Sequence, residues 1–341
     1  MRTVTLGSTG IRTPQNAFGA LPIQRISQAE AVRLLRMAMD AGMTFFDTAR
    51  AYTDSEVKLG EAFAGVRERV YIASKTGAKT GEELKKDLET TLRNLNTDYL
   101  DLYQFHNPPF CPRPGEENGL YDAALEAKRQ GKIRHIGITN HRIGVASEAI
   151  DSGLFETLQF PFCYLATERD IELVDRCREK NIGFIAMKGL SGGLLTNAAA
   201  AYAYIAQFDN VLPIWGVQRE SELAEFLSFM KNPPVLTDEL RRVIENDRRE
   251  LLGNFCRSCG YCMPCPENIQ IYNCARMSQL IRRSPSEPWL RPDKQAMMEQ
   301  ITHCRGCGLC KTRCPYGLDI PELLKKNLED YRRIVSGEIK L

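Results

Sequence analysis

The chain has 341 residues, enough for one large domain or two ordinary ones, and its 43% hydrophobic and 26% charged residues are typical of a globular protein. No apolar run approaches the roughly 18 residues that a bilayer-spanning helix requires, which argues against a membrane protein. The net charge is +2, and the basic excess lies between Asn254 and Leu341, where 14 Lys and Arg accompany 9 Asp and Glu. The N-terminal residues are too polar for a signal peptide, so we expect a cytoplasmic protein.

Strands and helices alternate through the first part of the chain. A short hairpin near Val4–Leu6 precedes a first strand at Asn16–Leu21. The further predicted strands are Thr44–Phe46, Val70–Ser74, Leu100–Phe105, Ile133–Thr139, Thr157–Phe162, Gly183–Met187 and Val211–Val217. The predicted helices start at Ser27 and Ser55 and then occupy Glu82–Leu95, Leu120–Gln130, Arg169–Lys180, Ala198–Phe208 and Glu222–Met230. Eight strands that alternate with helices predict a (β/α)8 TIM barrel, and no Gly-x-Gly-x-x-Gly turn follows the first strand to suggest a Rossmann domain.

Ionisable side chains end three successive predicted strands. Asp47 ends the second strand, Lys75 the third and His106 the fourth, and Tyr52 lies in the loop after Asp47. In a parallel barrel these positions share the catalytic face, so we expect the four side chains to meet in one pocket. Any one of them alone is explained as well by a strand cap or an ion pair.

The four side chains suit a proton donor. A tyrosine with its ordinary pKa near 10 is a weak acid, but a neighbouring ammonium stabilises the phenolate and lowers that pKa. Lys75 is placed to act in this way on Tyr52, and Asp47 to keep Lys75 charged. His106 is placed to polarise a carbonyl oxygen that accepts the proton.

The motifs around these residues resemble the aldo-keto reductase superfamily. They are Phe46-Asp47-Thr48-Ala49-x-x-Tyr52-x-x-Ser55-Glu56-x-x-Leu59-Gly60, Ser74-Lys75 and Asp98-Tyr99-Leu100-Asp101-Leu102-Tyr103-x-x-His106. The resemblance implies hydride transfer between a nicotinamide cofactor and a carbonyl or alcohol, with Tyr52 as the general acid. It also implies cofactor contacts at Thr139, Asn140 and Gln159 for the carboxamide and at Met187, Leu190 and Gly192 for the ring and pyrophosphate.

The end of the barrel departs from this pattern. After the eighth strand the family places an Arg or Gln near the adenosine phosphate and a Glu-Asn pair on the adenine. This sequence has Glu222 followed by Glu225-Phe226. Glu222 would repel a 2′-phosphate, and Arg219 is near enough in sequence to compensate. We therefore expect Arg219 and Glu225 to contact the dinucleotide, and the sequence leaves NADPH and NADH both open.

Two groups of four cysteines occupy the last part of the chain. They are Cys256, Cys259, Cys262 and Cys265, followed by Pro266, and Cys304, Cys307, Cys310 and Cys314, followed by Pro315. The second group has the bacterial ferredoxin spacing, and the first is one residue shorter before its last cysteine. Structural zinc is the alternative, but three closely spaced cysteines with a distant fourth suit a cubane better than paired zinc ligands do.

We therefore predict two 4Fe-4S clusters in an α-helical ferredoxin-like module. By analogy with ferredoxins, one cluster takes Cys314 with the first three cysteines, and the other takes Cys265 with Cys304, Cys307 and Cys310. Each cubane with four thiolates carries roughly −2, which offsets the basic excess, so we expect no nucleic-acid partner. We interpret Cys274 as a small buried hydrophobic residue.

The predicted organisation is a reductase-like barrel at 1–232, a connecting helix at 233–253 and a dicluster ferredoxin-like domain at 254–341. The favoured function is an oxidoreductase for a small carbonyl or alcohol, with the clusters as an electron-transfer route to a redox-protein partner. The alternative is an iron–sulfur electron-transfer protein that uses the barrel as a scaffold or docking module.

Overall fold

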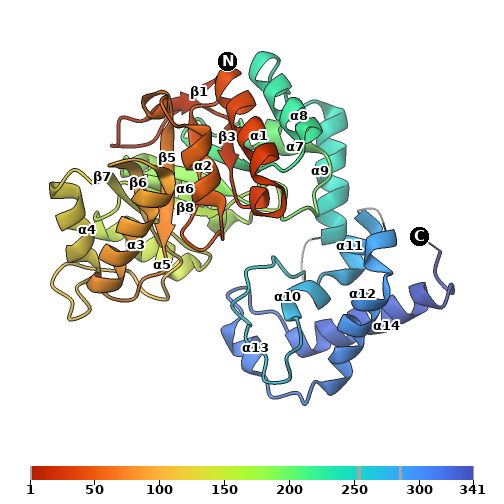
Figure 1. The fold of residues 1–341 in the computed structure, drawn as a ribbon. Coiled ribbons are helices and arrows are strands. Elements are labelled where there is room, and N and C mark those ends of the chain that lie inside the picture. Colours follow the sequence, from red (N-terminus) through yellow and green to blue (C-terminus); the bar gives the residue numbers. More distant parts are fainter. Residues whose placement is uncertain (1, 252–254, 284–285, 341) are drawn as a thin grey trace. The chain divides into compact units, whose positions relative to one another are not determined.

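The computed structural model describes residues 2–251, 255–283 and 286–340 (Figure 1). The chain forms two compact units. Unit 1 comprises Met1–Gly189 and Ala198–Thr237, and unit 2 comprises Leu190–Asn197 and Asp238–Leu341. The segment expected to connect two domains therefore contributes its helix to unit 2. The predicted boundary between the connecting helix and the last domain, at 253 and 254, lies outside the described residues.

Unit 1 is a closed barrel of eight parallel strands, which confirms the predicted TIM barrel. Around the barrel the order is β10-β3-β4-β5-β6-β7-β8-β9, so that strands adjacent in sequence are adjacent in space. The strands are β3 (Ala17–Gly19), β4 (Phe45–Asp47), β5 (Tyr71–Thr76), β6 (Leu100–His106), β7 (Ile133–Thr139), β8 (Thr157–Pro161), β9 (Gly183–Met187) and β10 (Val211–Gly216).

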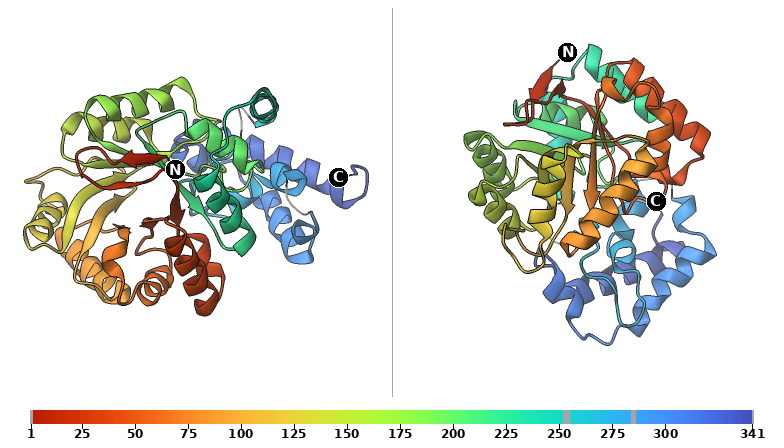
Figure 2. Two further views of the ribbon diagram at one scale, coloured as in Figure 1. Left: turned by 90° about the horizontal axis from the view of Figure 1, so that it is seen from above. Right: turned by 60° about the vertical axis from the view of Figure 1, so that its left-hand side comes forward.

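Helices follow the strands and form an outer layer around them (Figure 2). They are η1 (Pro22–Arg25), α1 (Gln28–Asp40), α2 (Ser55–Ala62), η2 (Arg67–Arg69), α3 (Gly81–Leu95), α4 (Leu120–Arg129), α5 (Ile143–Ser152), α6 (Glu168–Glu179), α7 (Ala198–Ile205) and α8 (Glu220–Lys231). The sequence analysis missed α5. Its N-cap residue Arg142 makes no side-chain cap hydrogen bond, and Gly144 lowers helix propensity in its first turn, so the usual start signals are absent.

A hairpin of β1 (Thr3–Thr5) and β2 (Arg12–Pro14) precedes the barrel, as expected. Val4, Leu6 and Ile11 from the hairpin region pack in one buried cluster with residues inside the barrel, such as Phe45 and Leu102. This contact closes the end of the barrel from which the strands start, so the open end is the one where the strands finish.

Aromatic side chains fill the layer between β10 and its helices. Trp215 is 1% exposed and stacks on Phe226 of α8, with ring centres 4.5 Å apart, and on Tyr202 of α7. Gly189 lies against the same indole: a Cβ atom at this position would come within 2.5 Å of Trp215 Cζ3. Only glycine fits there, because a side chain at 189 would displace the ring.

Unit 2 is helical. Its elements are α9 (Asp238–Leu251), α10 (Ile271–Cys274), α11 (Met277–Arg283), η3 (Glu287–Trp289), α12 (Pro292–Glu299), η4 (Gln300–His303), α13 (Leu309–Arg313) and α14 (Ile320–Val335). The helical pattern of the sequence predicts one helix at Asn268–Arg283, but the structure has two shorter helices there, and no helix starts at Asn268, whose φ is +56°. Among the described residues, no helix has both the length and the apolar character needed to cross a bilayer.

The core of unit 2 is a single apolar cluster. It includes Ile281 of α11, Met298 of α12 and Leu324 of α14, together with two of the predicted metal ligands, Cys256 and Cys262. The sequence analysis did not predict α14, although its start signals are present. Asp319 caps Glu322 N, and Pro321 occupies the first turn.

Candidate active site and cluster-binding cysteines

Three barrel strands and one loop bring the four predicted catalytic side chains together. Lys75 Nζ donates to Asp47 Oδ2 at 2.6 Å and to the carbonyl oxygen of Thr48 at 2.6 Å. The same nitrogen lies 5.1 Å from the centre of the Tyr52 ring, and the His106 ring meets Tyr52 edge-on with centres 5.9 Å apart. The strand ends thus converge on a single site, as the sequence predicted.

The electrostatics differ from expectation at Tyr52. We expected Lys75 to lower the pKa of the phenol. Instead, burial raises the pKa of Tyr52 above its usual value, and the Lys75 ammonium offsets only part of that effect. Burial also raises the pKa of Asp47, against the opposing pull of Lys75. Tyr52 is therefore a neutral phenol at neutral pH, which is the protonation state that a general acid needs.

His106 is held neutral. Burial lowers the pKa of His106, the charge of Lys75 acts in the same direction, and together they bring it to about 3. A neutral imidazole has one N–H donor, so His106 is suited to donate a hydrogen bond to a carbonyl oxygen and unsuited to act as a proton source.

These shifts predict the pH dependence of carbonyl reduction. Since His106 becomes charged only below about pH 3, kcat/KM for an aldehyde should show no acid limb near the ordinary histidine pKa. The rate should fall on the alkaline side, where Tyr52 loses its proton as the pH passes a raised pKa. Steady-state rates between pH 5 and 11 test this, because the alkaline fall should lie above the ordinary phenol pKa near 10. An acid limb near pH 6.5 that disappears in a His106→Gln enzyme would contradict the assignment.

Gln104 is a site residue that the sequence analysis missed. Its Nε2 donates to Gln159 Oε1 at 3.0 Å and lies 3.5 Å from Asp47 Oδ1, so it links a predicted catalytic residue to a predicted cofactor contact. The signal was available, because residues two apart on a strand share a face and His106 follows Gln104 at that interval.

A buried glutamate anchors the loop that carries Tyr52. Glu56 is fully buried, pairs with Arg50 of that loop, and accepts hydrogen bonds from Ser74 Oγ at 2.9 Å and Thr91 Oγ1 at 2.8 Å. The backbone N–H of Arg50 in turn donates to the carbonyl of Lys75. The Tyr52 loop is thereby attached to the strand that supplies the lysine.

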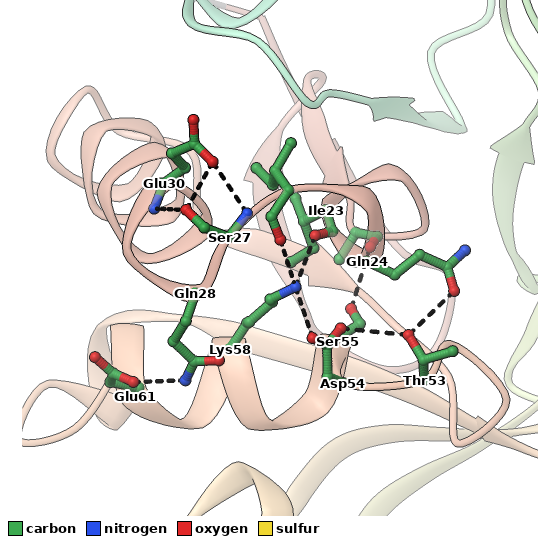
Figure 3. A network of polar contacts seen from close by, with 12 residues as sticks. Ile23, Gln24, Ser27, Gln28, Glu30, Thr53, Asp54, Ser55, Lys58 and Glu61 are labelled. Atoms are coloured by element: carbon green, nitrogen blue, oxygen red, sulfur yellow. Dashed lines mark hydrogen bonds and ion pairs between the residues drawn. The ribbon is translucent and has the colours of Figure 1, made fainter.

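Lys58 fixes the position of the segment that follows the Tyr52 loop (Figure 3). Its side chain is 2% exposed, and Nζ donates to the carbonyl oxygens of Ile23 at 3.0 Å and Ile26 at 2.8 Å. It also pairs with Asp54 at 2.8 Å. One ammonium thus joins the η1 loop after β3 to the start of α2, directly after the Tyr52 loop.

Lys58→Met should destabilise unit 1 by about 2–4 kcal/mol, because it removes a buried ammonium that donates to the carbonyl oxygens of Ile23 and Ile26 and pairs with Asp54, while it keeps most of the packing. Urea unfolding monitored by circular dichroism measures the change. Lys85→Met on the exposed face of α3 is the matched control and should change stability by less than about 0.5 kcal/mol. Equal stability of the two variants would show that the Lys58 contacts contribute little.

Cysteines of both sequence groups lie near one another in unit 2. Burial raises the pKa of Cys256, and the sulfurs of Cys259 and Cys314 act in the same direction, so these sulfurs lie near one another. Cys304 and Cys307 have the same effect on the pKa of Cys310. A cavity is lined by Cys262 and by all members of the second predicted set, Cys265, Cys304, Cys307 and Cys310.

These thiols fit a cluster better than a single ion. Within residues 2–251, 255–283 and 286–340, no three His, Cys, Asp or Glu side chains gather as they do around one metal ion. Five cysteines line one cavity instead, an arrangement compatible with a cubane. The assignment of individual cysteines to each cluster stays a prediction.

Comparison with protein families agrees with both parts of the chain. Residues 12–200 match the model of the aldo/keto reductase family, and residues 255–319 match a 4Fe-4S dicluster domain. The chain belongs to the aldo/keto reductase family. It is thus an aldo-keto reductase family oxidoreductase that carries a 4Fe-4S dicluster domain, as the sequence predicted.

Several enzymes of the family are similar in sequence. L-galactose dehydrogenase from Arabidopsis thaliana is 28% identical over 56% of this chain and 66% of its own length. 6-dehydroglucose reductase from Novosphingobium aromaticivorans is 32% identical over 40% of this chain and 50% of its own length. Methylglyoxal reductase YeaE from Escherichia coli is 32% identical over 61% of this chain and 80% of its own length. The chain therefore spans between half and four fifths of these relatives.

Solved aldo-keto reductases share the fold of the barrel. The enzyme AKR11C1 from Bacillus halodurans superposes with a TM-score of 0.63 at 20% identity, covering 72% of this chain and 96% of its own. An aldo-keto reductase from Klebsiella pneumoniae in complex with NADPH superposes with a TM-score of 0.61 at 23% identity, covering 72% of this chain and 94% of its own. At these identities the likeness concerns the fold alone.

The residues that the aldo-keto reductase pattern assigns to the nicotinamide are buried at strand ends. Thr139 ends β7 and pairs in register with His106, and Gln159 lies on β8 beside it. Asn140 follows Thr139; its Nδ2 donates to Pro108 O at 2.8 Å, and its Oδ1 accepts from two backbone N–H groups. Met187 ends β9 and is half-buried, whereas Leu190 and Gly192 belong to unit 2.

The residues expected at the adenosine end are engaged with one another. Glu222 closes a capping box at the start of α8, where it accepts from the backbone N–H of Arg219 and pairs with its guanidinium at 2.5 Å. Glu225 is exposed on α8, and Phe226 is buried under Trp215. Glu222 therefore has a structural role at the start of α8, and it pairs with Arg219, the cation that the sequence predicted at the dinucleotide.

Proposed function

We propose that the barrel catalyses hydride transfer between NADPH or NADH and a small carbonyl or alcohol, and that two 4Fe-4S clusters exchange single electrons with a redox-protein partner. The observation that carries the hydride chemistry is the position of Lys75. Its ammonium lies 2.6 Å from Asp47 Oδ2 and 5.1 Å from the centre of the Tyr52 ring. A merely structural ion pair would not require a phenol and a neutral imidazole beside it.

In the reducing direction, Tyr52 gives its phenolic proton to the carbonyl oxygen, and neutral His106 donates a hydrogen bond to the same oxygen. Bound NADPH or NADH supplies the hydride, which brings two electrons to the carbonyl carbon. Lys75 stabilises the phenolate that remains, and Asp47 keeps the ammonium oriented. The product is the alcohol, and solvent returns the proton to Tyr52.

The nicotinamide cofactor is supported from two directions. The Klebsiella pneumoniae relative was solved with NADPH, and the three relatives named above as a dehydrogenase or reductases act on carbonyl or alcohol groups. Against a preference for NADPH, the Arg219 guanidinium is already paired with Glu222. Both cofactors therefore stay in the proposal.

The exposure of the cysteines indicates which cluster contacts the redox partner. Cys304 and Cys307 are exposed, whereas Cys256 and Cys262 are buried. Electron transfer between proteins requires close approach, so we assign contact with the redox partner to the cluster held by the more exposed set. Two clusters hold two electrons in total, the number that one hydride carries.

The second candidate function is an electron-transfer protein whose barrel is a scaffold. Phe226 favours it, because this residue stands where the family places an adenine-binding asparagine and is buried against Trp215 instead. A scaffold would bind no dinucleotide.

Titration of the full chain with NADPH and with NADH decides between the two functions. The proposal expects enhanced or shifted nicotinamide fluorescence on binding and its loss when an aldehyde is added. A scaffold leaves the fluorescence of both cofactors unchanged, and that result would overturn the proposed hydride chemistry. Anaerobic iron and sulfide analysis of the same sample tests the clusters independently.

A further inference from the structure

Unit 2 includes a segment from the middle of the chain. Leu190–Asn197 runs between β9 and α7 in sequence, yet it groups with the helices that carry the cysteines. The segment contains Leu190 and Gly192, two of the predicted cofactor contacts. Ser191 has a φ of +48°, an unfavourable conformation for a residue with a side chain, so the loop must be held by contacts outside itself.

Arg276 supplies such contacts. It lies between α10 and α11, and its Nη2 donates to the carbonyl oxygens of Ser191 and Gly192, each at 3.1 Å. A Cβ atom at Gly192 would come within 3.1 Å of Arg276 Nη1, so the guanidinium packs closely on the loop backbone. Arg283 donates to the carbonyl of Leu194 at 3.1 Å and is a second anchor.

The two arginines differ in their charge partners. Arg283 pairs with Asp247 at 2.8 Å and also with Glu250. Arg276 is 5% exposed, and its Nε has no hydrogen-bond partner. Within the described part of the chain, no Asp or Glu forms an ion pair with it. A buried guanidinium without an anion costs several kcal/mol, so a negative group is required nearby.

The sulfur of Cys256 is the charge that acts on Arg276. Burial lowers the pKa of Arg276, and the Cys256 side chain acts in the opposite direction. A cluster with four thiolate ligands carries roughly −2 and would provide the missing anion.

We propose that Arg276 is a positioning residue that couples the cluster bound through Cys256 to the loop Leu190–Asn197. Its charge stabilises the cluster, more so after the cluster gains an electron, and its N–H groups hold the loop carbonyls. Reduction of this cluster therefore tightens the attachment of a segment that contains two of the predicted cofactor contacts, Leu190 and Gly192. The inference rests on the proposed ligation by Cys256, which Cys256→Ser tests separately through its iron content.

The test uses the full chain and two readouts, a redox titration followed by electron paramagnetic resonance and hydrogen exchange of the peptide covering 190–197. In Arg276→Met, one cluster should shift to a more negative reduction potential while the other is unchanged. Exchange in the loop should become about tenfold faster, which corresponds to about 1.4 kcal/mol. Unchanged potentials in this variant would overturn the proposed charge role.

Two further variants separate charge from attachment. Arg276→Lys keeps the charge but not the paired donors, so its potential should stay near that of the native protein while the loop exchanges faster. Arg283→Met should also speed exchange in the loop but leave both potentials unchanged.

The native protein alone provides a last test, which does not depend on any variant folding. The loop should exchange more slowly in the reduced protein than in the oxidised protein. Equal exchange in the two redox states would overturn the coupling, even if the nicotinamide titration succeeds.

Discussion

Replacing Tyr52 with phenylalanine should lower carbonyl reduction by about 10²–10⁴-fold while leaving cofactor binding intact. The substitution removes the phenolic proton and keeps the ring that packs edge-on against His106. Lys75→Met should be similarly damaging, because the phenolate that forms during turnover then loses its cation. Steady-state rates with an accepted aldehyde, together with a nicotinamide titration of each variant, measure the effect.

Tyr103→Phe is the matched control for this prediction. Tyr103 lies on β6, is 2% exposed, and loses the same hydroxyl group without belonging to the catalytic set. Its turnover should stay close to that of the native enzyme, with unchanged cluster content. A Tyr52→Phe enzyme that is as active as Tyr103→Phe would show that another group donates the proton.

Replacing Cys310 with alanine should remove one of the two clusters and destabilise unit 2. Cys310 packs against the core of this unit and lines the cavity formed by the second set of cysteines. Each cluster needs four thiolates, so iron should fall from about eight to about four atoms per chain. Because a small module depends on its metals for folding free energy, unit 2 should also melt at a lower temperature.

Cys274→Ala is the control for cluster loss. Cys274 is fully buried in the same core but lies outside both ferredoxin groups. This variant should lose some stability through the cavity it creates and keep all of its iron. Native protein that contains zinc and no acid-labile sulfide would contradict the cluster prediction, as would unchanged iron in Cys310→Ala.

The sequence predicted the parts of this molecule that depend on regular spacing. Alternating strands and helices are enough to predict a barrel, and the ends of parallel strands meet on one face, so Asp47, Lys75 and His106 could be placed together before any coordinates. The Cys-x-x-Cys runs are equally local signals. In each case the chemistry is set by residue types at fixed intervals along the chain.

What the sequence did not reveal depends on burial and on distant contacts. The raised pKa of Tyr52 results from desolvation, which no motif specifies. The grouping of Leu190–Asn197 with unit 2 depends on Arg276, more than 80 residues later. By analogy with the family, Glu222 was expected near the adenosine phosphate of the cofactor. Its capping contact with Arg219 explains its presence at the start of α8 instead.

The indole that packs against Gly189 is one of two tryptophan side chains, and together they give each unit its own fluorescence signal. The chain has two tryptophans, Trp215 in unit 1 and Trp289 in unit 2. Trp215 is almost fully buried between aromatic rings, and Trp289 is partly exposed at the edge of the unit 2 core. A dry indole emits at shorter wavelength than a hydrated one, and a nearby iron–sulfur cluster quenches emission. Loss of the short-wavelength emission therefore reports melting of the barrel. A gain of emission at longer wavelength while the short-wavelength emission is retained reports loss of the clusters, within one intact chain.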